Sequence, residues 1–242
     1  MPRVEAGGYK SSYAAIVSRR KKIALAIVLA PILLVVAVIL RGTVFAPTFD
    51  VPSIATTPHY KETAFVDRAW ALPVAATFDH RVVSQTNGSV CGPASLANIL
   101  RSLGDAGATQ DSVLAGTGKC GTGICWMGLT LDEVADIARQ KTTRKVLVHR
   151  DLDLASFRTH LWRANDPSHR YLINFQRGLL FGKGTGHHSP IAAYLEAEDL
   201  VFVLDVNEKF GPWLVTSERL FQAMDSVDSS SGKKRGLVEI TD

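Results

Sequence analysis

Cysteine is scarce in this chain of 242 residues, which holds three cysteines, and we find no internal repeat or low-complexity tract. Two of the cysteines, Cys120 and Cys125, lie in one glycine-rich loop, and no further cysteine or histidine lies nearby at zinc-finger spacing. Two thiolates by themselves cannot complete a structural zinc site. These absences exclude a zinc finger in this loop and a repeat architecture for the chain.

Net charge is also low once the first 22 residues are set aside. The formal net charge is +4 because residues 1–22 hold six Lys or Arg side chains and one Glu, whereas the remaining residues hold 21 basic and 22 acidic side chains. A nearly neutral body gives no reason to invoke nucleic acid, so we expect no nucleic-acid partner. Hydrophobic residues make up 46% of the chain, which is enough for one sizeable core.

Residues 23–40 form an uncharged apolar stretch that follows four basic residues at positions 19–22. The stretch is longer than the roughly 7–15 apolar residues of a secretory signal, and it predicts a transmembrane helix. Residues 44–46 resemble a cleavage site, but Pro47 directly after them favours a retained anchor. The basic cluster marks the cytoplasmic side, so we expect the rest of the chain outside the cytoplasm, in the periplasm if the source is a Gram-negative bacterium.

The chain divides into a basic cytoplasmic tail (1–22), the anchor, a Pro-, Thr- and Ser-containing linker (41–62) and one globular domain (63–242). Apolar periodicity and capping residues in the first half of the domain predict helices over residues 94–103, 130–140 and 153–162. The apolar side of the last of these helices would hold Phe157, Leu161 and Trp162, and Ser217 would cap a later helix over 218–224. Runs rich in β-branched and aromatic residues predict strands over 146–149, 171–175, 189–195, 200–206 and 236–240. The fold class is therefore α+β with an antiparallel meander in its second half.

Cys91 stands where a polar loop turns into the first of these helices. Pro93 fits the first turn, where a missing N–H costs nothing, and apolar residues recur along one stripe of the helix. Unpaired backbone N–H groups at a helix N-terminus favour a thiolate over a thiol. The pattern indicates a reactive cysteine, and the alternative is a small buried core residue.

A cysteine nucleophile needs a base and a group that orients the base, in one large class in the order Cys, His, Asn or Asp. His187 begins one predicted strand and Asp205 lies near the end of the next, which would place both at one end of a sheet. Adjacent residues on a strand point to opposite faces, so at most one of His187 and His188 should serve a given site. Asp205 could instead begin a turn, and Gln85 could be either an oxyanion donor or a surface residue.

These motifs, in order and spacing, resemble the phytochelatin synthase family. The resemblance spans about residues 72–240 and rests on the following segments: Gln85, Cys91-Gly92-Pro93-Ala94-Ser95, Asn174, Gly186-His187-His188-Ser189-Pro190-Ile191-Ala192-Ala193-Tyr194, Asp205-Val206, and Ala223 to Gly236. It implies a papain-like fold and the activity of a glutathione γ-glutamylcysteinyltransferase, which transfers the acyl group to a second glutathione or to water.

The resemblance also assigns roles to residues. It implies Cys91 as nucleophile, His187 as base and later acid, Asp205 as its orienting partner and Gln85 as oxyanion donor. It implies substrate binding by three further residues: Arg235 at the γ-glutamyl end, Asn174 and Ser189. It requires no cofactor for the chemistry, with stimulation by Cd, Zn or Cu expected to act through a metal–thiolate form of the substrate. Whether the chain forms a homodimer is left open by the sequence.

The chain departs from the family pattern in two places. Glu208 stands where the family often has an arginine, and the segment up to Trp213 is one residue shorter, so acceptor handling is expected to differ. We expect no cysteine-rich metal-sensing region like that of the plant members after the domain. We therefore expect hydrolysis to compete strongly with transpeptidation.

Two other functions remain open from the sequence. A thiol peptidase that trims leader peptides would use the same Gln, Cys, His and Asp scheme. A non-enzymatic metal-binding module at the membrane would use the three cysteines with His187 and His188. For Cys120 and Cys125 we expect a disulfide rather than a soft-metal thiolate pair, because the domain is expected in an oxidising compartment.

Overall fold

The computed structural model describes residues 21–37, 46–126 and 128–242, which belong to two units divided after Ala46. In the first unit, residues 21–37 form a helix whose described side chains are exposed. None of the helices among the described residues combines the length and the apolar character needed to cross a bilayer. Residues 38–40 of the expected anchor, the tail over 1–20 and part of the linker lie outside the described residues.

The second unit, residues 47–242, begins earlier than the domain start expected at residue 63. Ile54 is buried in the core, and Tyr60 accepts a backbone hydrogen bond from Leu214. Phe49 pairs with Gly182 through its backbone N–H, and its ring packs onto Gly178. Residues 47–62 therefore form part of the folded unit, because their few apolar side chains complete its core.

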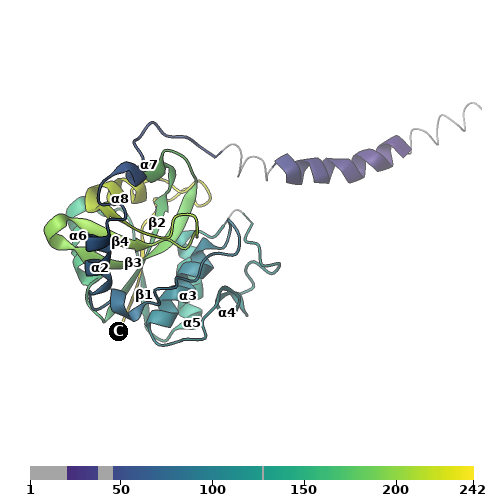
Figure 1. Cartoon of the computed structure of the whole chain (residues 1–242). Helices are drawn as coiled ribbons and strands as arrows, with labels where there is room; N and C mark the ends of the chain where they lie inside the picture. Colours follow the sequence, from purple (N-terminus) through teal and green to yellow (C-terminus); the bar gives the residue numbers. More distant parts are fainter. Residues whose placement is uncertain (1–20, 38–45, 127) are drawn as a thin grey trace, which may run out of the picture. The chain divides into compact units, whose positions relative to one another are not determined.

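A six-stranded antiparallel sheet in the order β1-β6-β2-β3-β4-β5 forms the centre of this unit (Figure 1). The strands are β1 Lys145–His149, β2 His169–Gln176, β3 Gly186–Leu195, β4 Leu200–Leu204, β5 Pro212–Thr216 and β6 Leu237–Thr241. Strands β2 to β5 follow one another as the expected meander, and β6 inserts between β1 and β2. The α+β class predicted from the sequence is confirmed.

One face of the sheet is covered mainly by helices from the first half of the unit. These are α2 Thr63–Trp70, α3 Cys91–Ser102, α4 Gln110–Leu114 and α5 Leu131–Lys141. The apolar stripe of α3 packs with Leu172 and Ala192 of the sheet in one buried cluster. Thr130 caps α5 through a reciprocal capping box with Glu133, which satisfies two backbone N–H groups at its start.

The other face is covered by α6 Leu154–Arg163, α7 Gly178–Phe181 and α8 Ser217–Met224. Phe157 and Leu161 of α6 are fully buried there, but Trp162 is 49% exposed, so its expected place on the apolar side was wrong. Residue 162 lies about 100° around the helix from Leu161, which turns it away from the sheet. Thr216, rather than Ser217, caps α8 through its side-chain oxygen.

Candidate active site

Cys91 is the first residue of α3 and the free cysteine of the chain, with 6% of its surface exposed. The helix lies so close to its neighbours here that a Cβ on Gly92 would come 2.7 Å from a Val134 side-chain carbon and 3.8 Å from Nδ1 of His188. Glycine at position 92 therefore lets the start of α3 approach both α5 and the sheet. This close approach holds the thiol against the strand that carries the two histidines.

His187 and Asp205 form a buried pair beside the thiol. Nε2 of His187 lies 2.9 Å from Oδ1 of Asp205, which directly follows β4. Arg177 forms an ion pair with both carboxylate oxygens at 2.8 and 2.9 Å, and Trp213 donates its Nε1–H to Oδ2 at 3.0 Å. The backbone N–H of Asn207 also donates to Oδ1, so Asp205 begins a turn as well as pairing with His187. These donors fix the carboxylate in one orientation.

His188 reaches the same thiol through a different network. Its Nδ1 lies 3.7 Å from Cys91 Sγ, and its Nε2 lies 2.6 Å from Nδ2 of Asn174. Oδ1 of Asn174 accepts a hydrogen bond from Arg235 at 2.6 Å, so the amide must donate through Nδ2. His188 then accepts at Nε2 and carries its proton on Nδ1, facing the sulfur. The expectation that only one of the adjacent histidines serves the thiol was therefore wrong.

The charges of this cluster favour a thiolate–imidazolium pair. Burial alone raises the pKa of Cys91, but the contacts with His187 and then His188 outweigh it and hold that pKa well below its ordinary value. Burial and the charge of Arg177 lower the pKa of His187, whereas Asp205 and Cys91 raise it, and the net direction is upward. These directions favour a thiolate on Cys91 beside an imidazolium on His187, which is the charge state that cysteine nucleophiles use.

Gln85 lies in the loop that leads to α3. Its Nε2 donates to the backbone carbonyl of Asn87 at 2.9 Å, and its backbone N–H donates to Val206 next to Asp205. The second N–H of the amide remains for another acceptor. Its role as an oxyanion donor stays a prediction.

Arg235, Asn174 and Ser189 are buried at 5%, 2% and 0% exposure. Arg235 lies near enough to Cys91 for a charge on the sulfur to interact with the guanidinium. A guanidinium nitrogen of Arg235 also lies 3.6 Å from Oδ1 of Asp228. Arg235 and Asn174 thus belong to the cluster around the thiol. Ser189 lies two residues beyond His187 on β3, and its hydroxyl has no partner within the described residues. The roles of all three in substrate binding stay predictions.

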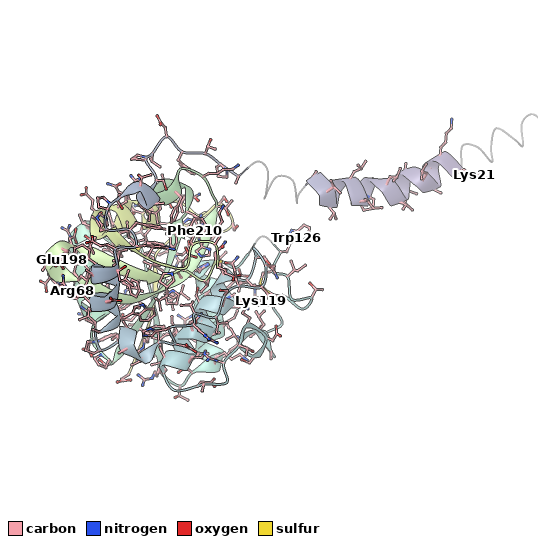
Figure 2. All side chains as sticks on the ribbon, in the orientation of Figure 1. Lys21, Arg68, Lys119, Trp126, Glu198 and Phe210 are labelled. Atoms are coloured by element: carbon pink, nitrogen blue, oxygen red, sulfur yellow. A yellow bond between two sulfur atoms is a disulfide. The ribbon has the colours of Figure 1, made fainter. Side chains whose placement is uncertain are left out.

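A disulfide joins Cys120 and Cys125 in the glycine-rich loop, which leaves Cys91 unpaired. The loop contacts the segment before Cys91 through two hydrogen bonds: the backbone N–H of Cys125 donates to the hydroxyl of Ser89, and the side-chain amide of Asn87 donates to the carbonyl of Gly123. A cleft of about 730 Å³ lies between this loop, the start of α5 and Ser229 and Ser230. Trp126 on its rim is 70% exposed and is labelled with Lys119 in Figure 2.

Sequence reasoning missed Arg177 and Trp213. Arg177 directly follows β2, and its backbone N–H donates to the carbonyl of Thr185, two residues before His187, a neighbourhood that only the pairing of β2 with β3 creates. Trp213 belongs to β5, a short strand that begins with a proline and was not predicted. Neither side chain carries chemistry by itself; both hold the carboxylate of Asp205.

Comparison with known proteins places the chain in a family. The family model for phytochelatin synthase matches residues 68–237, which is most of the second unit. The chain belongs to the phytochelatin synthase family. Glutathione gamma-glutamylcysteinyltransferase 1 of Arabidopsis thaliana is 37% identical over 87 residues, which cover 35% of this chain and 18% of that protein. The glutathione gamma-glutamylcysteinyltransferase of Schizosaccharomyces pombe is 26% identical over 169 residues, covering 65% and 41%. The chain thus matches less than half the length of each of these relatives.

Solved structures similar to this phytochelatin synthase family member include two bacterial peptidases. The peptidase domain of Streptococcus ComA aligns with a TM-score of 0.46 at 15% identity, covering 67% of this chain and 98% of that domain. A putative C39-like peptidase from Bacillus anthracis aligns with a TM-score of 0.49 at 11% identity, covering 68% and 96%.

Proposed function

We propose that the chain is a cysteine-nucleophile acyl transferase that acts on glutathione. The observation that carries the proposal is the buried Cys91–His187–Asp205 arrangement, with the thiolate form of Cys91 favoured, in a member of the phytochelatin synthase family. The names of the curated relatives support glutathione as the substrate. A papain-like fold agrees with the helix-borne cysteine packed against an antiparallel sheet that carries the histidine.

The proposed reaction proceeds in two halves. The Cys91 thiolate attacks the carbonyl carbon between cysteine and glycine of glutathione, and the resulting oxyanion is stabilised by the N–H of Cys91 and by Gln85. His187 donates its proton to the glycine nitrogen as the C–N bond breaks, and glycine leaves. The γ-glutamylcysteinyl group remains on sulfur as a thioester.

In the second half, His187 acts as a base. It removes a proton from the amine of a second glutathione or from water, and the nucleophile attacks the thioester carbonyl. Breakage of the C–S bond returns the Cys91 thiolate and releases either the lengthened peptide or γ-glutamylcysteine. Asp205 keeps the imidazole of His187 in the orientation that both halves need.

Glycine release tests the proposal. The full chain is incubated with glutathione, and the products are identified by mass spectrometry. We expect glycine together with γ-glutamylcysteine or its polymer from the wild type, and none from Cys91→Ser. The double variant Cys120→Ser/Cys125→Ser is the matched control, because it removes two sulfurs without touching the nucleophile.

The other outcomes of this experiment would refute the proposal or favour one of the two alternative functions. Absence of glycine release from the wild type, with or without added Cd²⁺ or Zn²⁺, would refute the proposal. Hydrolysis of ordinary peptides but not of glutathione would favour the thiol peptidase. Metal binding that depends on Cys120 or Cys125, without any thioester, would favour the metal-binding module.

We further propose that no resident metal takes part in the chemistry, because the chain's own side chains supply the nucleophile, the proton carrier and the oxyanion donors. Stimulation by Cd, Zn or Cu would then act through the thiolate of the substrate. The test varies metal at fixed glutathione: the rate should follow the concentration of the metal–glutathione complex. A rate that follows free metal instead would contradict this account.

We also propose that residues 23–40 anchor the chain in a membrane, with the second unit on the non-cytoplasmic side. The uncharged composition of this stretch, the basic residues before it and the exposed apolar side chains of the helix over 21–37 support the proposal. The chain should stay in the membrane fraction after alkaline extraction, and a chain that begins at Pro47 should not. Release of the full chain by alkali would exclude an anchor.

A further inference from the structure

A polar cluster lies away from the thiol, on the sheet face that α6 covers. His149 at the end of β1, Glu239 in β6 and His160 in α6 each present one ligand atom, and these atoms all lie within 4.8 Å of one another. No other group of this kind is found among the described residues. Most neighbours on this face are apolar, including Phe157 and Leu161.

The strand register explains why these residues meet. Glu239 pairs with Tyr171 of β2 across one ladder, and His149 pairs with Leu237, two residues before Glu239, across the other. Side chains at such opposite and diagonal positions share one face of a sheet. The imidazole of His160, on α6, packs against this pair, and its ring centre lies 4.2 Å from that of His149.

Glu239 is held as metal-ligating carboxylates commonly are. Its Oε1 accepts hydrogen bonds from the hydroxyl of Tyr171 and from Nδ1 of His169, both at 2.7 Å. Its Oε2 lies 2.6 Å from Nε2 of His149. Two outer partners therefore fix one carboxylate oxygen, and the other oxygen faces an imidazole nitrogen. Such partners orient metal ligands.

Burial and access also suit a cation. Glu239 is 2% exposed, whereas the side chains of His149 and His169 are 22% and 19% exposed and leave a path for an ion.

Hydrogen bonds partner the members of this cluster, because His149 contacts Glu239 and Nδ1 of His160 lies 3.2 Å from the hydroxyl of Tyr171. Burying several polar groups costs free energy that apolar side chains of similar volume would avoid, and the surrounding face is otherwise apolar. We propose that His149, His160 and Glu239 form a binding site for a divalent cation of the zinc class, which bridges β1, β6 and α6. Neutral imidazoles and one carboxylate, without a thiolate, are ligands that Zn²⁺ accepts in tetrahedral sites.

The ion would take the place of the proton between His149 and Glu239. With metal–ligand distances of about 2.1 Å, tetrahedral ligands lie roughly 3.4 Å apart. The contact of 2.6 Å must therefore open slightly, and His160 must draw in from at most 4.8 Å. Rotation of the partly buried His149 and a small tilt of His160 would make these changes. The fourth position is left to water or to His169.

Direct binding tests the site, without reference to activity. The full chain carrying Cys91→Ser, which removes the competing thiol, is stripped with a chelator and titrated with Zn²⁺ by calorimetry and with Co²⁺ by visible absorption. We expect saturable binding of one ion per chain and cobalt ligand-field bands without sulfur-to-metal charge transfer. X-ray absorption of the zinc form should show only N and O ligands at about 2.0–2.2 Å, with scattering from at least two imidazoles.

Substitutions locate the ion. His149→Gln and Glu239→Gln, each on the Cys91→Ser background, should weaken binding by more than about tenfold. His80→Gln, an exposed histidine outside the cluster, is the matched control and should bind as before. Absence of Zn²⁺ and Co²⁺ binding, or sulfur in the zinc shell, would overturn the proposal. So would unchanged affinity in both cluster variants. The X-ray absorption result stands even if a cluster variant does not fold.

Discussion

The thiol of Cys91 faces two imidazoles whose partners differ. His187 has the carboxylate of Asp205 behind it, whereas His188 has the neutral amide of Asn174. A buried carboxylate stabilises an imidazolium, and an amide N–H donated to the ring does not. At the scale of the residue, this contrast supports the proposal that His187, rather than His188, carries the proton that moves during the reaction.

Substitution of each histidine separates the two roles. His187→Gln should lower the rate of glycine release by about 10²–10⁴, the usual contribution of a general acid–base group. His188→Gln should lower it by about tenfold or less, because it removes one hydrogen bond to the thiolate. The rates are compared under saturating glutathione. Equal losses in the two variants, or a larger loss in His188→Gln, would contradict this assignment.

The lowered pKa of Cys91 predicts how its reactivity varies with pH. A thiol whose pKa is depressed stays a thiolate as the pH falls below the ordinary value of about 8.5, so alkylation should persist there. In Asp205→Asn the imidazolium loses its partner and the pKa of Cys91 should rise, slowing alkylation at neutral pH roughly tenfold for each unit. The measurement is the rate of iodoacetamide modification of Cys91 from acid to alkaline pH. Identical profiles for the two chains would show that Asp205 does not act on the thiol.

At the scale of the element, β6 is held close to β1 by a glycine. A Cβ on Gly236 would lie 2.0 Å from the backbone oxygen of His149, and a backbone atom cannot move aside cheaply. Gly236→Ala should therefore lower the free energy of unfolding by at least about 2 kcal/mol. Denaturant titration measures it.

Gly121→Ala is the matched control for this variant. A Cβ there meets no atom within 4 Å, and the change should stay within about 0.5 kcal/mol. If Gly236→Ala proved as stable as the control, the close approach of β6 to β1 would be wrong. Because Arg235 directly precedes Gly236 and Glu239 lies within β6, this approach also positions both.

Elements with strong local signals were predictable from the sequence. Thr130 and Asp153 do cap α5 and α6, because side-chain oxygens at these positions satisfy backbone N–H groups whatever the tertiary context. Strand β5 was missed because it is short, begins with Pro212 and depends on β4 for pairing. The contact of His188 with Cys91 was missed because the alternation of side chains along a strand does not predict where the thiol lies relative to that strand.

At the scale of the whole molecule, residues 47–62 were expected to form a linker, but in the structure they pack as part of the folded unit. Composition alone indicated a linker, because three prolines break up the few apolar residues. The contacts of Ile54, Tyr60 and Phe49 depend on surfaces that only the complete unit provides. The local sequence pattern therefore could not predict these contacts.

Two truncations test this division. A chain starting at Pro47 should fold and release glycine from glutathione at the rate of the full chain, because it keeps the whole compact unit. A chain starting at Thr63 loses buried Ile54 and should be less stable by at least about 2 kcal/mol. Thermal and denaturant unfolding compare the two. Equal stability would show that residues 47–62 contribute nothing to the core.

The central claim is that Cys91 carries the γ-glutamylcysteinyl group during turnover, and trapping the thioester tests it most directly. The full chain is mixed with glutathione, quenched in acid within one turnover and digested for mass spectrometry. We predict that the peptide containing Cys91 gains the mass of one γ-glutamylcysteinyl group, that hydroxylamine removes it and that Cys91→Ser shows neither adduct nor glycine. Glycine release by Cys91→Ser at the wild-type rate, or an adduct on any other residue, would contradict the account.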